Sequence, residues 1–324
     1  MCPTGAYQLS LFEEEATQIS VQEAIQDITW SYSKRSTLER CTRQYYYNYF
    51  GANKLTAKQE PAKEALHFLK NSVKSRHLLS GGALHTVIKT YFLHARKGDI
   101  WNVDRLISFA QKIFRDSWAY SRAHPDGKVN LNEKYPPILL EEYYYEHPEA
   151  EDLCAAEESR LIDAVYSLAT EDIYEQFRVA GTTPGALIEY TFKLTGFPCK
   201  VSGQIDLACQ GDGKVTIVDW KLGVEDATGD NSLQLAAYGL WATNYFSCRP
   251  DMLYVCKAHL SSNEIVGFRV NAQALAAARA RIIQDAERMA VLEKYGKEAV
   301  VEAFTRCGKP LVCNMCVFRR VCYA

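Results

Sequence analysis

The segment Gly203–Lys221, GQIDLACQGDGKVTIVDWK, contains two apolar runs joined by the dipeptide Asp212-Gly213. Asp-Gly between two such runs is a strong signal for a β-hairpin with a two-residue turn. In that hairpin Asp206 and Asp219 are cross-strand partners, because each lies equally far from the turn. Opposed residues point to the same face of a sheet, and alternation along the strand places Lys221 on that face too. The hairpin therefore predicts two acids and a lysine in one patch.

The run before the hairpin, ALIEYTFKL (residues 186–194), predicts a third strand that ends at a Thr-Gly-Phe-Pro turn. A turn centred on Phe197-Pro198 sets Glu189 opposite Asp206 and adds a third acid to the patch. Carboxylates so close together are costly to bury without a cation, and oxygen ligands suit Mg²⁺ or Mn²⁺. A neighbouring lysine can orient a water or stabilise developing phosphate charge. The alternative is a solvated sheet face with a salt bridge.

Helical periodicity dominates the chain before this meander of three strands. It predicts a helix from Ser33 to Gly51, one over about 61–79, one opening on the glycine pair of GGALH, and two over about 102–123 and 149–180. After the meander, the pattern predicts a helix near 232–246, two strands, and a helix over about 272–295. This order predicts an α/β or α+β core with a helical lobe ahead of it.

The bulk composition is that of an ordinary globular protein, with 48% hydrophobic and 23% charged residues. The formal net charge of -2 excludes a global basic field for nucleic acid, so such a surface has to be local. The opening twenty residues lack a basic region and a long apolar run, and no membrane-spanning stretch is found. We expect a cytoplasmic protein without membrane contact.

The end of the chain, CNMCVFRRVCYA, crowds Cys313, Cys316 and Cys322 together, out of eleven cysteines in all. In a reducing compartment such clustering favours a metal over a disulfide. A metal held by thiolates usually needs a fourth ligand. Of the remaining cysteines, seven are scattered among mostly apolar neighbours and are expected to be buried free thiols.

The meander resembles the G-x-x-D … (D/E)-x-K signature of the PD-(D/E)XK nuclease superfamily, and other segments resemble its RecB-like branch in the expected order. GGALH is similar to the glycine-rich helix that supplies a metal-binding histidine, here His85. The resemblance implies that His85, Asp206 and Asp219 hold the divalent ion, with Glu189 assisting through water and Lys221 orienting the attacking water. QLAAY is similar to a downstream Q-x-x-x-Y motif, which implies that Gln234 and Tyr238 help to position the scissile strand.

The tail resembles an iron–sulfur subgroup of that branch, which includes CRISPR-associated spacer-processing nucleases and the AddB nuclease domain. The subgroup holds a [4Fe-4S] cluster by one cysteine before the nuclease core and three behind it in a C-x2-C-x5-C pattern. Cys41, in STLERCTRQYYYNYF, matches the leading position, so the implied ligands are Cys41, Cys313, Cys316 and Cys322. Four thiolates also suit Zn²⁺, which stays an alternative, and Cys307 is a possible substitute ligand.

The implied fold is a restriction-endonuclease-like α/β core, with a central mixed β-sheet flanked by helices, a helical insertion, and chain ends joined by the four-cysteine cluster. Residues 1–29 are a peripheral segment and residues 30–324 a single nuclease domain. Within this domain we expect N-terminal helices (30–97), the helical insertion (98–182), the nuclease core (183–296) and the cysteine tail (297–324).

The implied function is a metal-dependent DNA exonuclease acting on single-stranded ends or flaps, in DNA repair, recombination, CRISPR adaptation or the processing of mobile-element or phage DNA. Basic side chains such as Lys74, Arg76, Arg96 and Lys97 would hold the strand. The alternatives are a structure-specific or restriction-like endonuclease, and a non-cutting DNA-end-binding subunit that partners a helicase or an integrase. The sequence leaves open the cleavage polarity, the oligomeric state and the role of the insertion.

Overall fold

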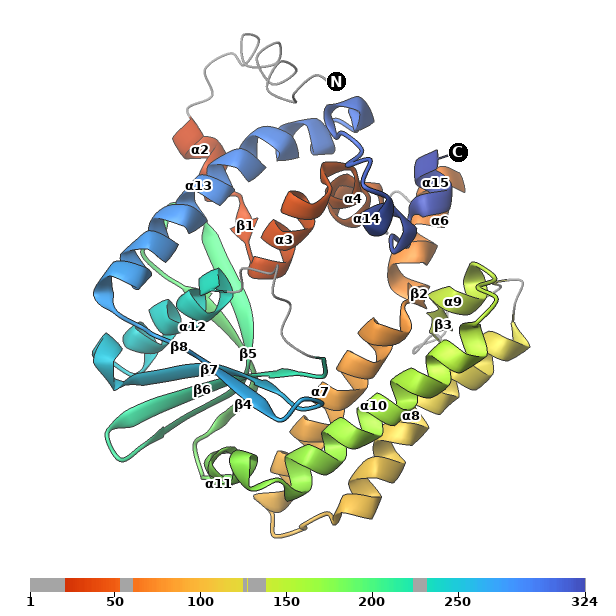
Figure 1. Ribbon diagram of the computed structural model, residues 1–324. Helices are drawn as coiled ribbons and strands as arrows, with labels where there is room; N and C mark the ends of the chain where they lie inside the picture. Colours follow the sequence, from red (N-terminus) through yellow and green to blue (C-terminus); the bar gives the residue numbers. More distant parts are fainter. Residues whose placement is uncertain (1–20, 53–60, 125–126, 128–137, 224–231, 324) are drawn as a thin grey trace.

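A six-stranded mixed β-sheet forms the centre of the protein (Figure 1). The computed structural model describes residues 21–52, 61–124, 127, 138–223 and 232–323, so most of the expected peripheral segment lies outside the described residues. The strand order is β1-β5-β6-β7-β8, with β4 also paired to β5. Their bounds are Thr29–Trp30 (β1), Leu187–Leu194 (β4), Lys200–Gly211 (β5), Lys214–Lys221 (β6), Leu253–His259 (β7) and Glu264–Phe268 (β8).

Both predicted registers of the meander are confirmed. In the second hairpin Leu207 pairs with Val218, so the next positions, Asp206 and Asp219, lie opposite each other. In the first hairpin the pairs 188–207 and 190–205 lie on either side of Glu189 and Asp206. Asp212 and Gly213 both have positive φ angles, of 49° and 74°, which is the backbone of a type I′ hairpin turn. In contrast, β6 and β7 run parallel, and α12 (Ser232–Tyr245) connects them.

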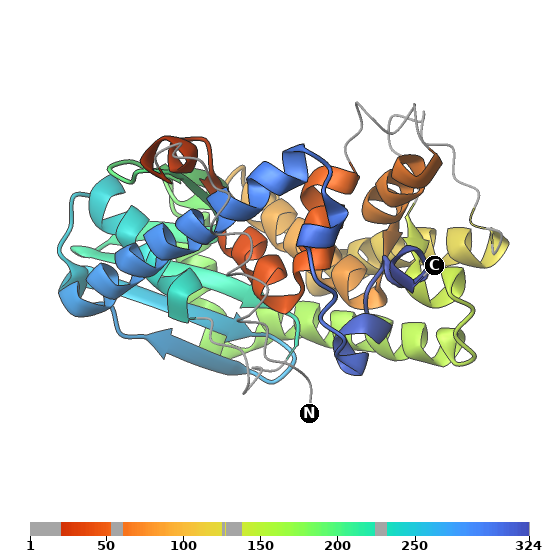
Figure 2. The same cartoon turned by 90° about the horizontal axis from the view of Figure 1, so that it is seen from above.

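Helices cover both faces of the sheet, and each face has its own apolar core. On one face lie α12 and α13 (Ala272–Lys297) together with the N-terminal helices; on the other lie α7 (Arg76–Ala95), α8 (Val103–Ala123), α10 (Ala150–Thr170) and α11 (Glu175–Thr182). Helices α8 and α10 pack against each other and extend away from the sheet (Figures 1 and 2). The α/β arrangement with a central mixed sheet flanked by helices agrees with the expected fold class.

The predicted helix over 61–79 is wrong at its end, and so is the predicted start of the next one. Helix α6 (Pro61–Ser72) stops before the short strand β2 (Val73–Lys74), and α7 begins at Arg76. Ser75 caps α7 because its hydroxyl accepts a hydrogen bond from the backbone N–H of Leu78. The glycine pair therefore lies inside α7 and does not open it.

The predicted helix from Ser33 to Gly51 is also interrupted. It consists of α3 (Tyr32–Arg40), α4 (Thr42–Tyr46) and a π-helical turn over Tyr47–Gly51. The break falls on Cys41, whose φ of -165° is extended. This break turns Cys41 out of a regular helix.

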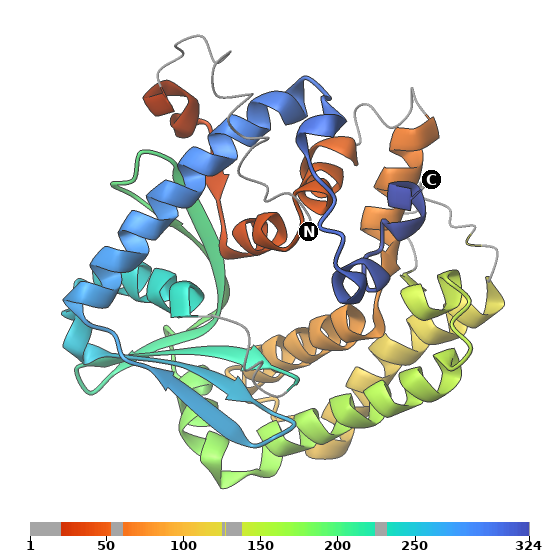
Figure 3. The same ribbon diagram turned by 45° about the horizontal axis from the view of Figure 1, so that its top comes forward.

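The start of helix α4 lies beside the segment that follows α13, close to the C-terminus (Figure 3). The Thr42 hydroxyl donates to the carbonyl of Thr305, and the Arg43 guanidinium donates to the carbonyl of Phe304. Phe304 is fully buried and its ring packs 5.0 Å from that of Tyr46. Thus protein contacts alone already join the N-terminal helices to the segment before α14 (Pro310–Asn314) and α15 (Arg319–Tyr323).

A single helical turn, α9 (Glu141–Tyr144), connects the tail to the helical lobe. It follows the short strand β3 (Leu139–Leu140), which pairs with β2. Glu142 forms an ion pair of 2.8 Å with Arg76 at the start of α7, and Glu141 forms one with Arg319 of the tail. No helix in the described part of the chain has the length and apolar character needed to span a membrane.

Candidate functional site

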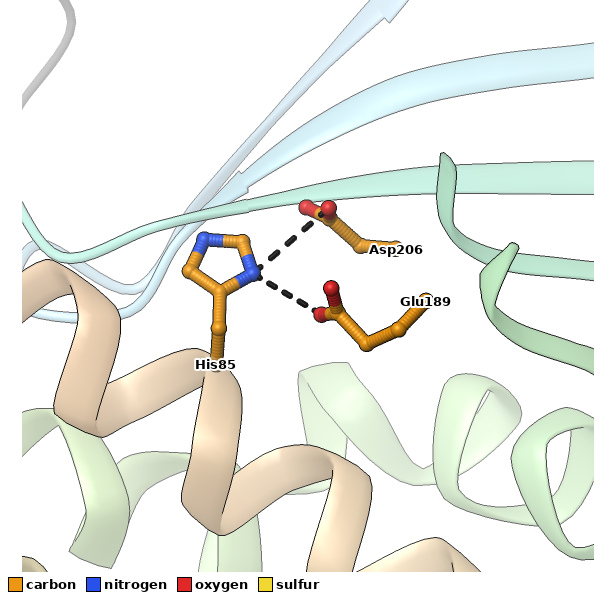
Figure 4. A group of neighbouring side chains, drawn as sticks. All are labelled: His85, Glu189 and Asp206. Carbon is orange, nitrogen blue, oxygen red and sulfur yellow. Dashed lines mark hydrogen bonds and ion pairs between the residues drawn. The ribbon is translucent and has the colours of Figure 1, made fainter. Parts of the chain in front are cut away.

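A histidine and two carboxylates converge at the edge of the sheet nearest α7 (Figure 4). Nδ1 of His85, on α7, lies 3.1 Å from Glu189 Oε1 and 3.5 Å from Asp206 Oδ1. One ligand atom from each residue lies within 4.8 Å of the other two. An imidazole nitrogen with two carboxylate oxygens is a donor set that suits a divalent cation.

Glu189 has an unusual backbone for a residue inside a strand. Its φ angle is 50°, a left-handed conformation that costs a residue with a side chain about 1 kcal/mol or more. The alternation of side chains along β5 is also interrupted near Glu189. Val201 and Ile205, at odd positions, pack in one core, and Ala208, at an even position, packs in the same core. Side chains of these two strands therefore switch from one face of the sheet to the other near the acids. The Gln204 amide donates a hydrogen bond to the Glu189 carboxylate.

Asp206 is buried and is held by the backbone of the neighbouring strand. Its Oδ2 accepts a 2.7 Å hydrogen bond from the backbone N–H of Trp220. Burial and the nearby charge of Asp219 raise the pKa of Asp206 to about 7, although His85 and Lys221 oppose this rise. Two buried acids that disfavour each other's ionisation call for additional positive charge between them.

Asp219 is buried within a hydrogen-bonded group from α12. Its Oδ1 accepts hydrogen bonds from the Tyr238 hydroxyl at 3.0 Å and from the Gln234 amide at 3.2 Å. Its Oδ2 accepts no hydrogen bond from the described residues, although the Lys221 ammonium forms an ion pair with it at 2.6 Å. The charge of this buried carboxylate is therefore balanced by the ammonium of Lys221.

The charged groups of the site perturb one another in a consistent direction. Burial works against the protonated form of His85, but the bond to Glu189 and the charges of Asp206 and Glu189 outweigh it and raise its pKa. Burial likewise works against charged Lys221, but Asp219 outweighs it and raises the pKa of the lysine. The side chains of His85 and Lys221 are 31% and 36% exposed, so the site is open to solvent on their side.

The family model of the PD-(D/E)XK nuclease superfamily matches residues 29–323. The chain belongs to the PD-(D/E)XK nuclease superfamily. No curated protein matches it. Membership indicates a nuclease whose substrate is DNA, and enzymes of this superfamily usually use Mg²⁺ or Mn²⁺.

The structure groups the PD-(D/E)XK residues differently from the expected ligand set of His85, Asp206 and Asp219. Glu189, and not Asp219, completes the compact group with His85 and Asp206. Asp219 forms a second group with Lys221, Gln234 and Tyr238. Tyr238 is only 4% exposed, and its hydroxyl donates a hydrogen bond to Asp219, so this side chain orients the acid.

Two buried polar residues on β7 border the site and were not predicted from the sequence. Lys257 is the cross-strand partner of Asp219, and His259 is the partner of Lys221; they are 2% and 3% exposed. His259 Nδ1 lies 2.7 Å from the carbonyl oxygen of Gly223, so Nδ1 carries the proton and Nε2 is left buried without a partner among the described residues. The sequence signal is a lysine and a histidine at alternate positions in YVCKAHL. It points to this site only when the parallel pairing of β6 with β7 is known.

Two of the four basic residues expected to hold DNA are engaged inside the protein. Arg76 forms its ion pair with Glu142, and Arg96 donates to the backbone carbonyls of Gly181 and Ala186. Both guanidinium groups are therefore already used in contacts within the protein. Each fastens α7 to a neighbouring element.

Five cysteines of this PD-(D/E)XK protein line one pocket at the junction of the chain ends. Its lining residues are Cys41, Gln44, Tyr47, Arg306, Cys307, Val312, Cys313, Cys316, Arg319, Cys322 and Tyr323. All four predicted thiols are therefore brought together, with Cys307 beside them. Among these sulfurs no three lie within 4.8 Å of one another, so the set is not closed around a single small ion.

Proposed function

We propose that this protein is a divalent-metal-dependent DNA nuclease, and that it acts as an exonuclease on single-stranded ends or flaps. The observation that carries the proposal is the convergence of His85, Glu189 and Asp206 beside the Asp219–Lys221 ion pair. The exonuclease mode and the preference for single strands rest on the resemblance to the RecB-like branch. The same resemblance supports a role in DNA repair, recombination, CRISPR adaptation or mobile-element and phage DNA processing, with a helicase or integrase as partner.

The residues of the site fit Mg²⁺ or Mn²⁺. His85, Glu189 and Asp206 would hold one ion, and the buried carboxylate of Asp219 lies near enough to interact with the charge of Asp206. The raised pKa of Asp206 reflects burial beside Asp219, a cost that a bound cation removes. When bound, the metal lowers the pKa of a coordinated water and neutralises charge on the phosphate.

The remaining residues orient and hold the reacting groups. Lys221 stays protonated beside Asp219, so its ammonium can donate a hydrogen bond to a water or to a phosphate oxygen at the solvent side of the site. Tyr238 and Gln234 fix the carboxylate of Asp219 from α12. The backbone N–H of Trp220 fixes the carboxylate of Asp206.

Substitution of Asp206 by Asn, compared with the same change at Asp212, tests the catalytic assignment. Asp212 belongs to the same hairpin but lies exposed in its turn, where Asn tolerates the positive φ angle. Asp206→Asn should abolish Mn²⁺-dependent degradation of end-labelled single-stranded DNA, whereas Asp212→Asn should degrade it like the wild type. Equal activity of the Asp206 variant and the wild type would refute the assignment. Closed circular single-stranded DNA should resist the wild-type protein; its cleavage would indicate an endonuclease.

We further propose that Cys41, Cys313, Cys316 and Cys322 hold a [4Fe-4S] cluster, with structural Zn²⁺ as the alternative. Support comes from the shared pocket, which brings the four thiols together, and from the resemblance of the cysteine spacing to the iron–sulfur subgroup. Anaerobic purification followed by iron, sulfide and zinc analysis decides between the two. Cys316→Ser should lose the bound metal while Cys248→Ser, at a cysteine outside the pocket, retains it.

A further inference from the structure

Cys307 is a fifth thiol in a pocket that would need only four. Its Sγ lies 3.7 Å from the Sγ of Cys313, close to van der Waals contact and without a covalent bond. All of these cysteines are partly exposed, but Cys316 and Cys322 pack against the apolar core, whereas Cys307 and Cys313, here called the rim cysteines, do not. The two rim sulfurs are therefore adjacent to each other and accessible from solution.

The backbone around this pair is suited to a small movement. Cys307 lies in the segment between fully buried Phe304 and helix α14, on which Cys313 is found. Between them, Gly308 adopts a φ of 64°, and the backbone N–H of Cys313 donates to the carbonyl of Lys309. A disulfide requires the sulfurs to approach to about 2.05 Å, a shift that an exposed loop flanked by a glycine can absorb.

We propose that Cys307 and Cys313 form an oxidative modification site, a reversible disulfide that closes when the pocket holds no metal. Closure removes Cys313 from the thiolate set, so the disulfide and the metal exclude each other. Formation of the bond depends only on the two thiols; its consequence for metal loading rests on the proposed function of the pocket.

A low-molecular-weight disulfide such as oxidised glutathione supplies the oxidising equivalents. The Cys313 thiolate attacks one sulfur of the oxidant, forms a mixed disulfide and releases one glutathione thiolate. The Cys307 thiolate then attacks Cys313 Sγ, forms the Cys307–Cys313 bond and releases the second glutathione. Two protein thiols are oxidised, one disulfide is reduced, and the two protons end on the two glutathione thiols.

Differential alkylation of the full chain tests the proposal. Metal-free reduced protein is treated with oxidised glutathione, its free thiols are blocked with iodoacetamide, and the thiols released by later reduction are labelled with N-ethylmaleimide. Trypsin leaves Cys307, Cys313 and Cys316 in one peptide, CGKPLVCNMCVFR, because Pro310 follows Lys309. Fragment ions should place maleimide on Cys307 and Cys313 and iodoacetamide on Cys316.

The variant Cys307→Ser separates this outcome from unspecific oxidation. It should retain glutathione on Cys313, because the resolving thiol is gone, whereas Cys248→Ser should form the same cross-link as the wild type. Protein that still carries its metal should lose the maleimide labelling. Maleimide on Cys316, or a Cys307→Ser variant that sheds glutathione like the wild type, would overturn the proposal. None of these readouts uses nuclease activity, and metal analysis of the loaded protein reports separately on the proposed cluster.

Discussion

The backbone N–H of Trp220 donates a 2.7 Å hydrogen bond to the side chain of Asp206 on the neighbouring strand. The residue between Asp219 and Lys221 thus fixes the other acid of the hairpin. Its indole points the opposite way and packs 5.6 Å from Phe177 in the second core. One residue therefore anchors β6 to the helical layer and holds the carboxylate of Asp206 against the same strand.

The left-handed backbone of Glu189 predicts a difference between two variants that lose the same carboxylate. Glu189→Gly should be about 1 kcal/mol more stable to urea than Glu189→Ala, because only glycine adopts this conformation without strain. Both should bind Mn²⁺ more weakly than the wild type in calorimetric titrations. Equal stability of the two variants would show that no strain is stored at this position.

The hydroxyl of Tyr238 predicts a role in holding Asp219. Tyr238→Phe should lower the free energy of unfolding by about 1–2 kcal/mol, since a hydrogen bond to a buried carboxylate is lost. It should also weaken Mn²⁺ binding by about tenfold, as is usual when a partner of a metal-site carboxylate is removed. Tyr190→Phe is the control, because that ring packs on Trp241 beside the site. Unchanged Mn²⁺ affinity of the Tyr238 variant would show that this tyrosine contributes to packing only.

His259 predicts a contrast between two amide substitutions. Its Nδ1 bond to Gly223 holds the chain just after Lys221, and Asn places an amide N–H where Nδ1 lies, whereas Gln places it near Nε2. His259→Asn should retain wild-type nuclease activity, and His259→Gln should lose activity because Lys221 is less well positioned. Hydrogen exchange of the peptide spanning residues 218–223 should rise only in the Gln variant. The same exchange in both variants would contradict this assignment.

Glu157, on α10, predicts how stability depends on pH. Burial by itself raises the pKa of this carboxyl, but hydrogen bonds from His77, Ser80 and Arg160 outweigh it and lower the pKa from 4.5 to about 2. The stabilisation is therefore fully present above about pH 4.5 and is lost as the pH falls from there to about 2. Glu157→Gln should be less stable than the wild type at pH 7, by on the order of 3 kcal/mol, and this difference should become smaller as the pH is lowered to 3 in urea titrations. A gap that is independent of pH would refute the linkage.

The meander could be predicted from the sequence because its geometry is local. Two tight turns and the alternation of apolar residues fix the registers of Glu189, Asp206 and Asp219 within 31 positions of the chain. Lys257 and His259 could not be placed in the same way. They reach the site through a parallel pairing of β6 with β7 across an intervening helix, and no turn encodes that register.

Helix ends and side-chain contacts also could not be predicted from the sequence. The boundary between α6 and α7 depends on capping by Ser75 and on the pairing of β2 with β3, a strand some 65 residues later in the chain. The positive φ of Glu189 and the burial of Tyr238 against Asp219 arise from tertiary packing. Motif spacing identified these residues but not which of them contact one another.

The adjacent acids of α9 give the tail an influence on protonation. Burial raises the pKa of Glu141, while Arg319 of the tail works to lower it, and the charge of neighbouring Glu142 balances Arg76 at the start of the helix that carries His85. Proteolytic removal of the tail would therefore take away a counterion as well as four thiols. Without Arg319, Glu141 would lose the cation that works to lower its pKa, so a change at the C-terminus would alter the charge balance at the base of helix α7.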